Sequence, residues 1–406
     1  MASDTTEPDD ITTDVVPELA PPPTVVRNFI AAPWHRPRKQ YLRKYQWNYE
    51  LVELVIKKRL AGTNDQTLRV FGLPSHEYLD LLSMRPLCEE HKLQVVYLGF
   101  NNSYTRPAGA AHGPAQPVDL YQELQAQRMI EASSFVHTSS RLVPDFFEAI
   151  RQPNSMSLNA LKTFQDFDVI NLDLCGCVVG AGNEATHTLE AIAELLRRQC
   201  TKRVVPWLFF VTTFASPTEI NLSGCKPLID AIKANADGSA DFENDLKAKI
   251  NLDAAQLLAS FTTPGAATPQ ANDFISVFAL AMGKWLAAQL KVANPPSFVS
   301  MLPSYCFRHE GITDPQLLSL AYLIEPKPSA DGIGVAIAPA VPPDHTKAYI
   351  DRSRKLLTKS FQLKDLDALM TSDTAKRKEV AVETEALLID IGFDETQVRT
   401  FIAQHA

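Results

Sequence analysis

The sequence has 406 residues, of which 45% are hydrophobic and 21% are charged, and its formal net charge is −8. These values are those of a globular protein with two or three compact units, and they exclude a chain that is disordered throughout. The acidic balance argues against nucleic-acid binding over the whole surface and leaves only a local basic patch for it.

Residues 1–34 are predicted to form a disordered acidic tail. Residues 1–26 carry six acidic side chains, no basic ones and a run of three prolines. This composition cannot bury enough apolar surface to fold alone. The start of the chain has no signal-peptide pattern, so we expect a cytoplasmic protein whose six cysteines stay reduced.

The charge reverses in residues 35–64, where apolar and aromatic residues recur at helical spacing and predict a basic amphipathic helix. Basic side chains mixed with tyrosine and tryptophan could grip a phosphate backbone and stack on bases. The alternative is that the apolar stripe packs on the core while the charges are solvated. The nucleic-acid hypothesis rests on Arg36, Arg38, Lys39, Arg43 and Lys44.

Residues 65–216 alternate strand and helix patterns. Apolar runs predict strands at 67–71, 93–100, 168–174 and 204–214, with a weak one at 134–137. Helices are expected between them, including one at 76–91 for which Ser75 is the predicted N-cap. Apolar strands separated by helices are typical of a parallel sheet covered on both faces, so the sequence predicts an α/β fold.

The second half of the chain is mostly helical. Residues 217–295 predict a helical insertion, whose most apolar segment, 274–292, is broken by Gly283 and Lys284 and so reads as a core helix with no membrane span. Strands at 297–307 and 317–324 predict an antiparallel hairpin that completes the sheet domain, formed by residues 65–216 and 296–326. A linker at 327–345 then precedes a helical region at 346–406, which we expect to dock on the main domain or on a protein partner.

Three short segments carry the candidate site. The turn after the first strand contains Gly72, where a missing side chain lets the backbone approach a ligand closely; an ordinary structural turn explains it equally well. After the second strand come Asn101 and Asn102, which could bond a hydroxyl or serve a turn alone. Asp173 ends the strand at 168–174, where a carboxylate points into the crevice of a parallel sheet and is costly unless it is paired or solvated.

The order of these elements resembles the seven-stranded, Rossmann-like sheet of class I S-adenosylmethionine-dependent methyltransferases over about residues 65 to 325. In that family the first turn is glycine-rich and an acidic residue follows the second strand, whereas here Gly72 and Asn101 stand in those places. The segment 171–176 is similar to the Asp-Pro-Phe-Gly sequence of three-Cys-motif partner proteins and of some guanine-N2 transfer-RNA methyltransferases. It matches at Asp173 and Gly176 and departs at Leu174 and Cys175.

The resemblance implies an S-adenosylmethionine-dependent methyltransferase acting on nucleic acid, with Asp173 placing the methyl acceptor. Its cofactor site would be formed by Phe71, Gly72, Pro74, Ser75, Asn101 and Asn102. The departures favour an alternative, a catalytically inactive methyltransferase-like binding or scaffolding subunit of a larger assembly, with the C-terminal helices as its protein-binding surface. Cys175 could be a nucleophile, but a buried thiol is the simpler interpretation. The sequence lacks paired CxxC, HxxxH and HExxH motifs, so no catalytic metal is predicted.

Overall fold

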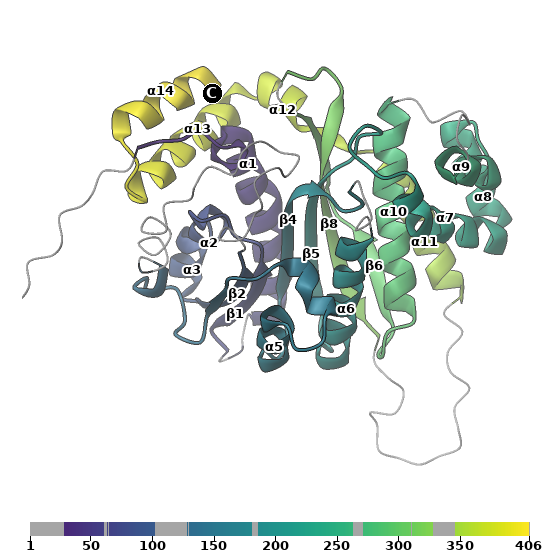
Figure 1. Ribbon diagram of the computed structural model, residues 1–406, viewed down its shortest axis with the longest axis horizontal. Helices are drawn as coiled ribbons and strands as arrows, with labels where there is room; N and C mark the ends of the chain where they lie inside the picture. Colours follow the sequence, from purple (N-terminus) through teal and green to yellow (C-terminus); the bar gives the residue numbers. More distant parts are fainter. Residues whose placement is uncertain are drawn as a thin grey trace, which may run out of the picture.

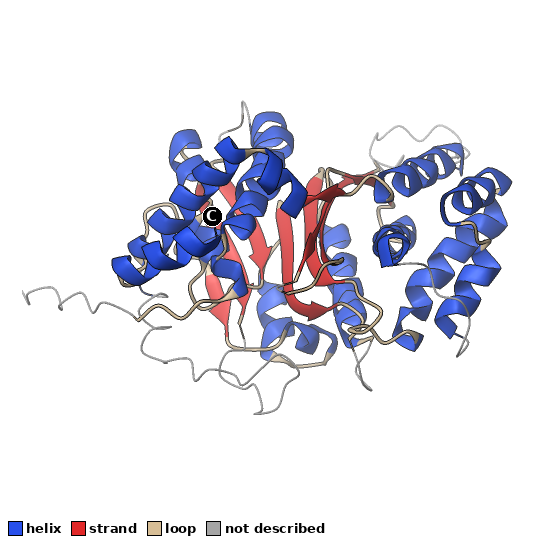
Figure 2. Ribbon diagram, turned by 90° about the horizontal axis from the view of Figure 1, so that it is seen from above, coloured by secondary structure: helices blue, strands red, loops and turns tan. Residues whose placement is uncertain are grey.

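The computed structural model describes residues 28–60, 63, 65–101, 128, 130–180, 186–262, 271–309, 311–327 and 346–405. In these residues one sheet of nine strands runs through the molecule, with helices on both of its faces (Figures 1 and 2). The strands are β1 (Thr67–Gly72), β2 (Gln94–Phe100), β3 (Arg141–Val143), β4 (Val169–Cys177), β5 (Trp207–Phe214), β6 (Ser297–Met301), β7 (Tyr305–Arg308), β8 (Pro315–Pro326) and β9 (Lys364–Asp365).

The strand order is β3-β2-β1-β4-β5-β8-β7-β9, with β6 also paired to β8. The first five strands are mutually parallel, and β8 runs antiparallel to β5. This is the 3-2-1-4-5 order of a doubly wound sheet, which makes the fold Rossmann-like. The order reverses between β1 and β4, and such folds bind ligands at the carboxyl ends of the strands at that point.

The predicted hairpin is present, but the predicted total of seven strands is wrong for the described chain. Strands β6 and β7 pair one after the other with β8, on the side that faces away from β5. They are two halves of one strand position, interrupted at residues 302–304, where Pro303 has no N–H to donate to the ladder. The two-residue strand β9 then adds an edge beyond β7.

The helices follow the predicted order. Their bounds are η1 (Pro33–His35), α1 (Pro37–Leu42), η2 (Arg43–Asn48), η3 (Leu51–Leu60), α2 (Leu79–Leu82), α3 (Arg85–His91), η4 (Phe147–Arg151), α5 (Met156–Thr163), α6 (His187–Lys202), η5 (Ser223–Cys225), α7 (Lys226–Gly238), α8 (Ala240–Ile250), α9 (Ala254–Thr262), α10 (Ala271–Lys291), α11 (Thr346–Ser360), α12 (Leu366–Ser372), α13 (Thr374–Asp390) and α14 (Glu395–His405). Segment α10 is long and apolar enough to cross a membrane, but 72% of its apolar window is buried inside the protein, which makes it a core helix.

The sheet separates two hydrophobic cores. Helices α5, α6 and α7 to α11 pack on one face, where Phe71, Leu172 and Phe209 point. The other face is covered by the N-terminal segment from α1 to η3, by α2 and α3, and by α12 to α14. In Figure 1 the N-terminal helix lies between the sheet and the C-terminal helices α13 and α14. The predicted basic helix is therefore a structural part of the domain.

Three local predictions need correction. The chain from residue 28 onward is ordered, and Phe29 and Trp34 pack against the second core, so the predicted tail at 1–34 is too long; residues 1–27 lie outside the described residues. The helix predicted at 76–91 is broken in two and starts at Leu79, because Tyr78 has a left-handed backbone with φ 54°; Ser75 does not cap it. At 134–137 the described chain makes one isolated bridge, Val95 to Val136, and no strand.

Candidate functional site at the carboxyl edge of the sheet

The reversal of strand order brings Gly72, at the end of β1, beside Asn171 of β4. Because side chains alternate along a strand, Asn171 and Asp173 point to the same face, which is the face covered by the N-terminal helix. The Asn171 side chain is buried, and its oxygen makes no hydrogen bond within the described residues. This part of β4 thus holds two polar side chains that point to the same face of the sheet.

Asp173 is held by a residue of the predicted basic helix. The Lys39 ammonium lies 2.5 Å from the Asp173 carboxylate, and it also sits over the Trp47 ring, 4.8 Å from the ring centre. Asp173 is paired with Lys39, and 17% of its side chain remains exposed. Burial raises the pKa of Asp173 above its ordinary value, and this effect outweighs the opposite pull of Lys39.

A second ion pair lies next to the first. The Arg43 guanidinium donates to Asp80 at 2.7 Å and to the Trp34 carbonyl at 3.1 Å. Asp80 adds to the rise in the pKa of Asp173, whereas Arg43 acts against it, which shows that the two pairs share one electrostatic environment. The cluster of Lys39, Arg43, Asp80 and Asp173, called here the edge cluster, joins the N-terminal helix to β4 and α2.

The space beside Gly72, at the end of β1, is filled by an aromatic ring from β2. A Cβ placed on Gly72 would lie 2.5 Å from the Tyr97 hydroxyl, and one on Gly99 would lie 2.5 Å from a carbon of the same ring and 3.1 Å from Pro74. The two glycines therefore make room for Tyr97, which is itself buried. Burial raises the pKa of Tyr97 well above its ordinary value, so the hydroxyl stays protonated.

The other predicted cofactor residues are split between core and edge. Phe71 is fully buried and packs its ring against Phe100 and Phe167 in the core of the opposite face. The backbone N–H of Asn101 donates to Val143 at 3.0 Å, which places this residue at the end of β2 as expected. Asn102 lies outside the described residues, as do the other residues of 102–127 and residues 181–185, which follow β2 and β4.

Glu77 is a buried anchor that the sequence analysis missed. Its carboxylate accepts from the Trp34 indole at 2.9 Å, lies 2.6 Å from His76 and 3.4 Å from His35, and is almost fully buried. Burial would raise the pKa of Glu77, but the two neighbouring histidines hold it well below its ordinary value. Glu77 thus ties the turn after β1 to the N-terminal segment.

The five residues of the nucleic-acid hypothesis separate into three groups. Lys39 and Arg43 are buried in the edge cluster. Lys44 forms ion pairs with Glu379 and Glu383 of α13. Arg36 and Arg38 instead line a cavity at the start of α1. The structure therefore does not gather these five cations on one face, and a role in nucleic-acid binding stays a prediction.

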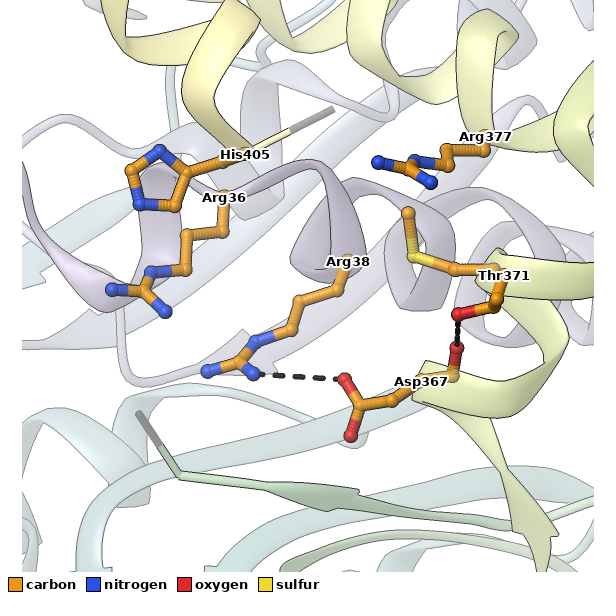
Figure 3. Close-up of a pocket in the computed structure, with 7 residues that line it drawn as sticks. Arg36, Arg38, Asp367, Thr371, Arg377 and His405 are labelled. Atoms are coloured by element: carbon orange, nitrogen blue, oxygen red, sulfur yellow. Dashed lines mark hydrogen bonds and ion pairs between the residues drawn. The ribbon is translucent and has the colours of Figure 1, made fainter. Parts of the chain in front are cut away.

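The cavity beside α1, called here the arginine cavity, has a volume of about 230 Å³ and opens to the surface. Its polar wall combines segments far apart in the sequence (Figure 3). The polar residues that line it are Arg36, Arg38, Asp367, Thr371, Arg377 and His405. Sequence analysis had no signal for it, because Arg377 and His405 come from helices more than 300 residues beyond α1.

Burial makes two of the described cysteines poor nucleophiles, and the described side chains form no metal-binding group. Burial raises the pKa of the Cys88 and Cys177 thiols to about 12, so both stay protonated. Within the described residues, no group of three or more histidine, cysteine, aspartate and glutamate side chains could hold a metal ion.

Comparison with known families places the chain in one of them. A family model described as PP_RS20740-like matches residues 27–403. The chain belongs to the PP_RS20740-like family. No curated protein matches this PP_RS20740-like chain. One solved structure similar to it is an rRNA methylase from Streptococcus thermophilus, with 11% sequence identity over 73% of this chain and 98% of that chain, and a TM-score of 0.30.

Proposed function

We propose that this PP_RS20740-like protein is an S-adenosylmethionine-dependent methyltransferase whose site is the carboxyl edge at β1 and β4. The observation that carries the proposal is the position of Asp173: a partly exposed carboxylate at the reversal point of a 3-2-1-4-5 sheet. The antiparallel closure by β8 and β7 supports it as well, since this is the closing hairpin expected from the resemblance.

The residues at the edge fit such a ligand in their chemistry. The side-chain amide of Asn101 suits ribose hydroxyls, and Asp173 suits an N–H or O–H of the methyl acceptor. When bound, the cofactor supplies an electrophilic methyl group. Asp173 then positions the acceptor, and its raised pKa makes it a better base than an ordinary carboxylate for the proton that the acceptor loses. Lys39 fixes the orientation of the carboxylate.

A second candidate function is binding without transfer, as a methyltransferase-like subunit of a larger assembly. The observation that favours it is the packing of Tyr97 over Gly72 and Gly99, which uses the glycine turn for an internal side chain. Pairing of Asp173 with Lys39 also gives the carboxylate a purely internal partner. On α13, exposed Val382 offers an apolar contact to a partner, while Val380 and Leu388 are buried.

Calorimetric titration with S-adenosylmethionine and S-adenosylhomocysteine tests the cofactor binding that methyl transfer requires. We expect micromolar binding of both ligands, near −8 kcal/mol at about 1 μM. The Asp173→Asn variant should keep this affinity within a few-fold, since Asp173 serves the acceptor. Asp237→Asn, in an exposed ion pair on α7, is the matched control. Absence of heat with either ligand, in a protein that unfolds cooperatively, would reject methyl transfer and leave the binding function.

A further inference from the structure

We propose that Ser353 and Lys284 form a second reactive site, in which Ser353 is the nucleophile of an esterase for short acyl groups. The proposal does not rest on methyl transfer, because neither residue belongs to the edge cluster. Ser353 lies on α11 and Lys284 on α10, two helices that pack side by side (Figure 1). Both side chains line one pocket, called here the lysine pocket, which these helices form together with β6.

Three polar groups meet at this place. The Nζ of Lys284 lies 2.6 Å from the Oγ of Ser353 and 2.5 Å from the Oδ1 of Asn235 on α7. The Ser353 Oγ also lies 3.0 Å from the Asn235 Oδ1. When Lys284 is uncharged, its N–H donates to Asn235 and its lone pair can accept the hydroxyl proton of Ser353. A nucleophile within reach of a base that a third group orients is the arrangement of hydrolytic triads.

The surroundings of Lys284 favour the uncharged amine. Its side chain is almost fully buried. Burial lowers the pKa of Lys284 to about 7, and the positive charge of Lys291 acts in the same direction. The charged residue that lines the pocket beside it, Arg352, is likewise a cation. Near neutral pH a large share of Lys284 can therefore accept a proton, whereas an ordinary lysine is almost wholly protonated there.

The same pocket is lined by two donors that lack an acceptor. The Tyr349 hydroxyl is buried and makes no hydrogen bond within the described residues. Arg352 uses its Nη1 for Glu325 at 2.7 Å and Ser300 at 2.9 Å, and in the described chain its Nη2 and Nε make no hydrogen bond. Burial raises the pKa of Tyr349, so its hydroxyl stays a donor. Unpaired donors close to a nucleophile are what a developing oxyanion requires.

The size of the lysine pocket selects the acyl group. Its volume is about 20 Å³, room for a water-sized group, and its apolar wall includes Ala287, Val299 and Leu356. The methyl group of an acetyl ester matches this space, whereas a longer acyl chain exceeds it. Ser353 is partly exposed, so the alcohol part of the ester can remain outside the pocket.

The reaction needs water as its only co-reactant. The Ser353 Oγ bonds to the ester carbonyl carbon while Lys284 takes the hydroxyl proton, and the carbonyl oxygen becomes an oxyanion. The bond between the carbonyl carbon and the alcohol oxygen then breaks, and the alcohol leaves with the proton from Lys284. Water attacks the acetylated serine in the same way and gives a proton to Lys284. The bond to Oγ breaks, Ser353 regains that proton and acetic acid leaves.

Turnover of p-nitrophenyl acetate by the full-length protein tests the proposal. We expect turnover that rises with pH between pH 6 and 9 and levels off above the pKa of Lys284, because the uncharged amine is the base. The butyrate ester should react at least about tenfold more slowly. Turnover no faster than that of the protein unfolded in urea overturns the proposal. So does equal turnover of the two esters, since the acyl group would then lie outside the pocket.

Variants locate the reaction. Ser353→Ala and Lys284→Met should each lower kcat/KM by about a hundredfold or more, and Tyr349→Phe by about tenfold or more. Ser353→Cys keeps a nucleophile and should still become acetylated at position 353, as peptide mass spectrometry of the acid-quenched protein measures. The matched controls are Ser372→Ala, at an exposed serine of α12, and Lys233→Met, in an exposed ion pair on α7. Unchanged turnover in Ser353→Ala, or no acetylation of Ser353→Cys in a cooperatively unfolding protein, overturns the proposal.

Discussion

Two aspartates five residues apart lie along the central strand β4: Asp168 comes just before its first residue, and Asp173 lies where its regular pairing with β5 ends. Their surroundings differ in kind. Asp168, at the amino edge, is fully buried; it accepts from Arg203 at 2.7 Å and from the backbone N–H of Arg69 at 2.9 Å, and it forms an ion pair with Arg59 at 2.9 Å. Asp173, at the carboxyl edge, has one side-chain partner among the described residues and remains partly exposed.

The comparison teaches how one residue type serves two purposes on one strand. At the amino edge the carboxylate is saturated by donors, and its acceptor sites are used within the fold. At the carboxyl edge the carboxylate retains exposed surface and a raised pKa. Perturbed carboxylates in sites of this kind are candidates for function, whereas saturated ones stabilise the structure. Replacing each aspartate in turn by asparagine should therefore change the stability of the protein by different amounts.

The largest effect is expected at the amino edge. Asp168→Asn leaves the Arg203 guanidinium buried, with Asp166 as its remaining carboxylate partner, and also weakens the contact with Arg59. We expect a loss of about 3–5 kcal/mol in the free energy of unfolding, the usual cost of removing one partner of a buried pair. Urea denaturation measures it, with Asp237→Asn as an exposed control. A loss below about 1 kcal/mol would mean that the network contributes little.

The next largest effect is expected from a buried lysine whose hydrogen-bond partners are neutral. Lys284 of α10 contacts Asn235 at 2.5 Å and Ser353 at 2.6 Å, and burial lowers its pKa to about 7. Between this value and the ordinary value of 10.5, the unfolded chain binds the proton and the folded chain does not. Stability should therefore rise with pH there, by up to about 1.4 kcal/mol per unit.

Lys284→Met should remove this rise, because methionine does not titrate. Comparing the denaturation of both proteins between pH 7.5 and 9.5 isolates the lysine, since the other groups cancel in the difference. A pH-independent difference would show that Lys284 stays charged in the folded state. Lys284 thus contrasts with Asp168. Asp168 is paired with arginines, whereas the described hydrogen-bond partners of Lys284 are both neutral.

A smaller effect is expected where the glycine turn meets Tyr97. Gly72→Ala places a Cβ against the Tyr97 hydroxyl and should cost about 1–3 kcal/mol of stability through overpacking. In the Tyr97→Phe background the same substitution should cost less, because the nearest atom is gone. A double-mutant cycle measures this coupling. Equal costs in both backgrounds would place the strain elsewhere.

The smallest effect is expected at the carboxyl edge itself. Because the folded pKa of Asp173 is raised above 3.8, the folded state binds more protons than the unfolded state just above that pH. The wild type should therefore lose stability relative to Asp173→Asn as the pH rises from about 3.8, by less than about 1.4 kcal/mol per unit. Paired denaturation curves between pH 3.5 and 6 test this. The opposite slope would indicate that Lys39 dominates and lowers the pKa.

Much of the fold could be predicted because its strands are continuous apolar runs. The run before Asp173 and the one at 204–214 read as buried strands and form β4 and β5. The short strand β3 escaped notice, because three partly exposed residues carry no periodic pattern. The position of Asp173 near the reversal of strand order could likewise be anticipated, although β4 continues to Cys177, three residues beyond the predicted end of the strand.

The partners of the site could not be predicted, because they are distant in sequence. Lys39 reads as a solvated surface cation, yet its carboxylate partner lies 134 positions away, and Arg43 finds Asp80 at 37 positions. The spacing of charges along the sequence does not distinguish a cation that will be solvated from one that will pair with a buried carboxylate. The arginine cavity, built from both ends of the chain, escaped notice for the same reason.

The position of the N-terminal helix between the sheet and the C-terminal helices has a consequence for how the chain is made. The ring of Phe29 packs against Phe393 and Phe401, and Gln40 bonds to Glu383. The N-terminal segment of this domain is synthesised before α13 and α14, and it therefore lacks some of its native contacts until those two helices have been made. The fold is therefore complete only after α13 and α14 have been synthesised, and until then part of the apolar face of the N-terminal segment lacks its native cover.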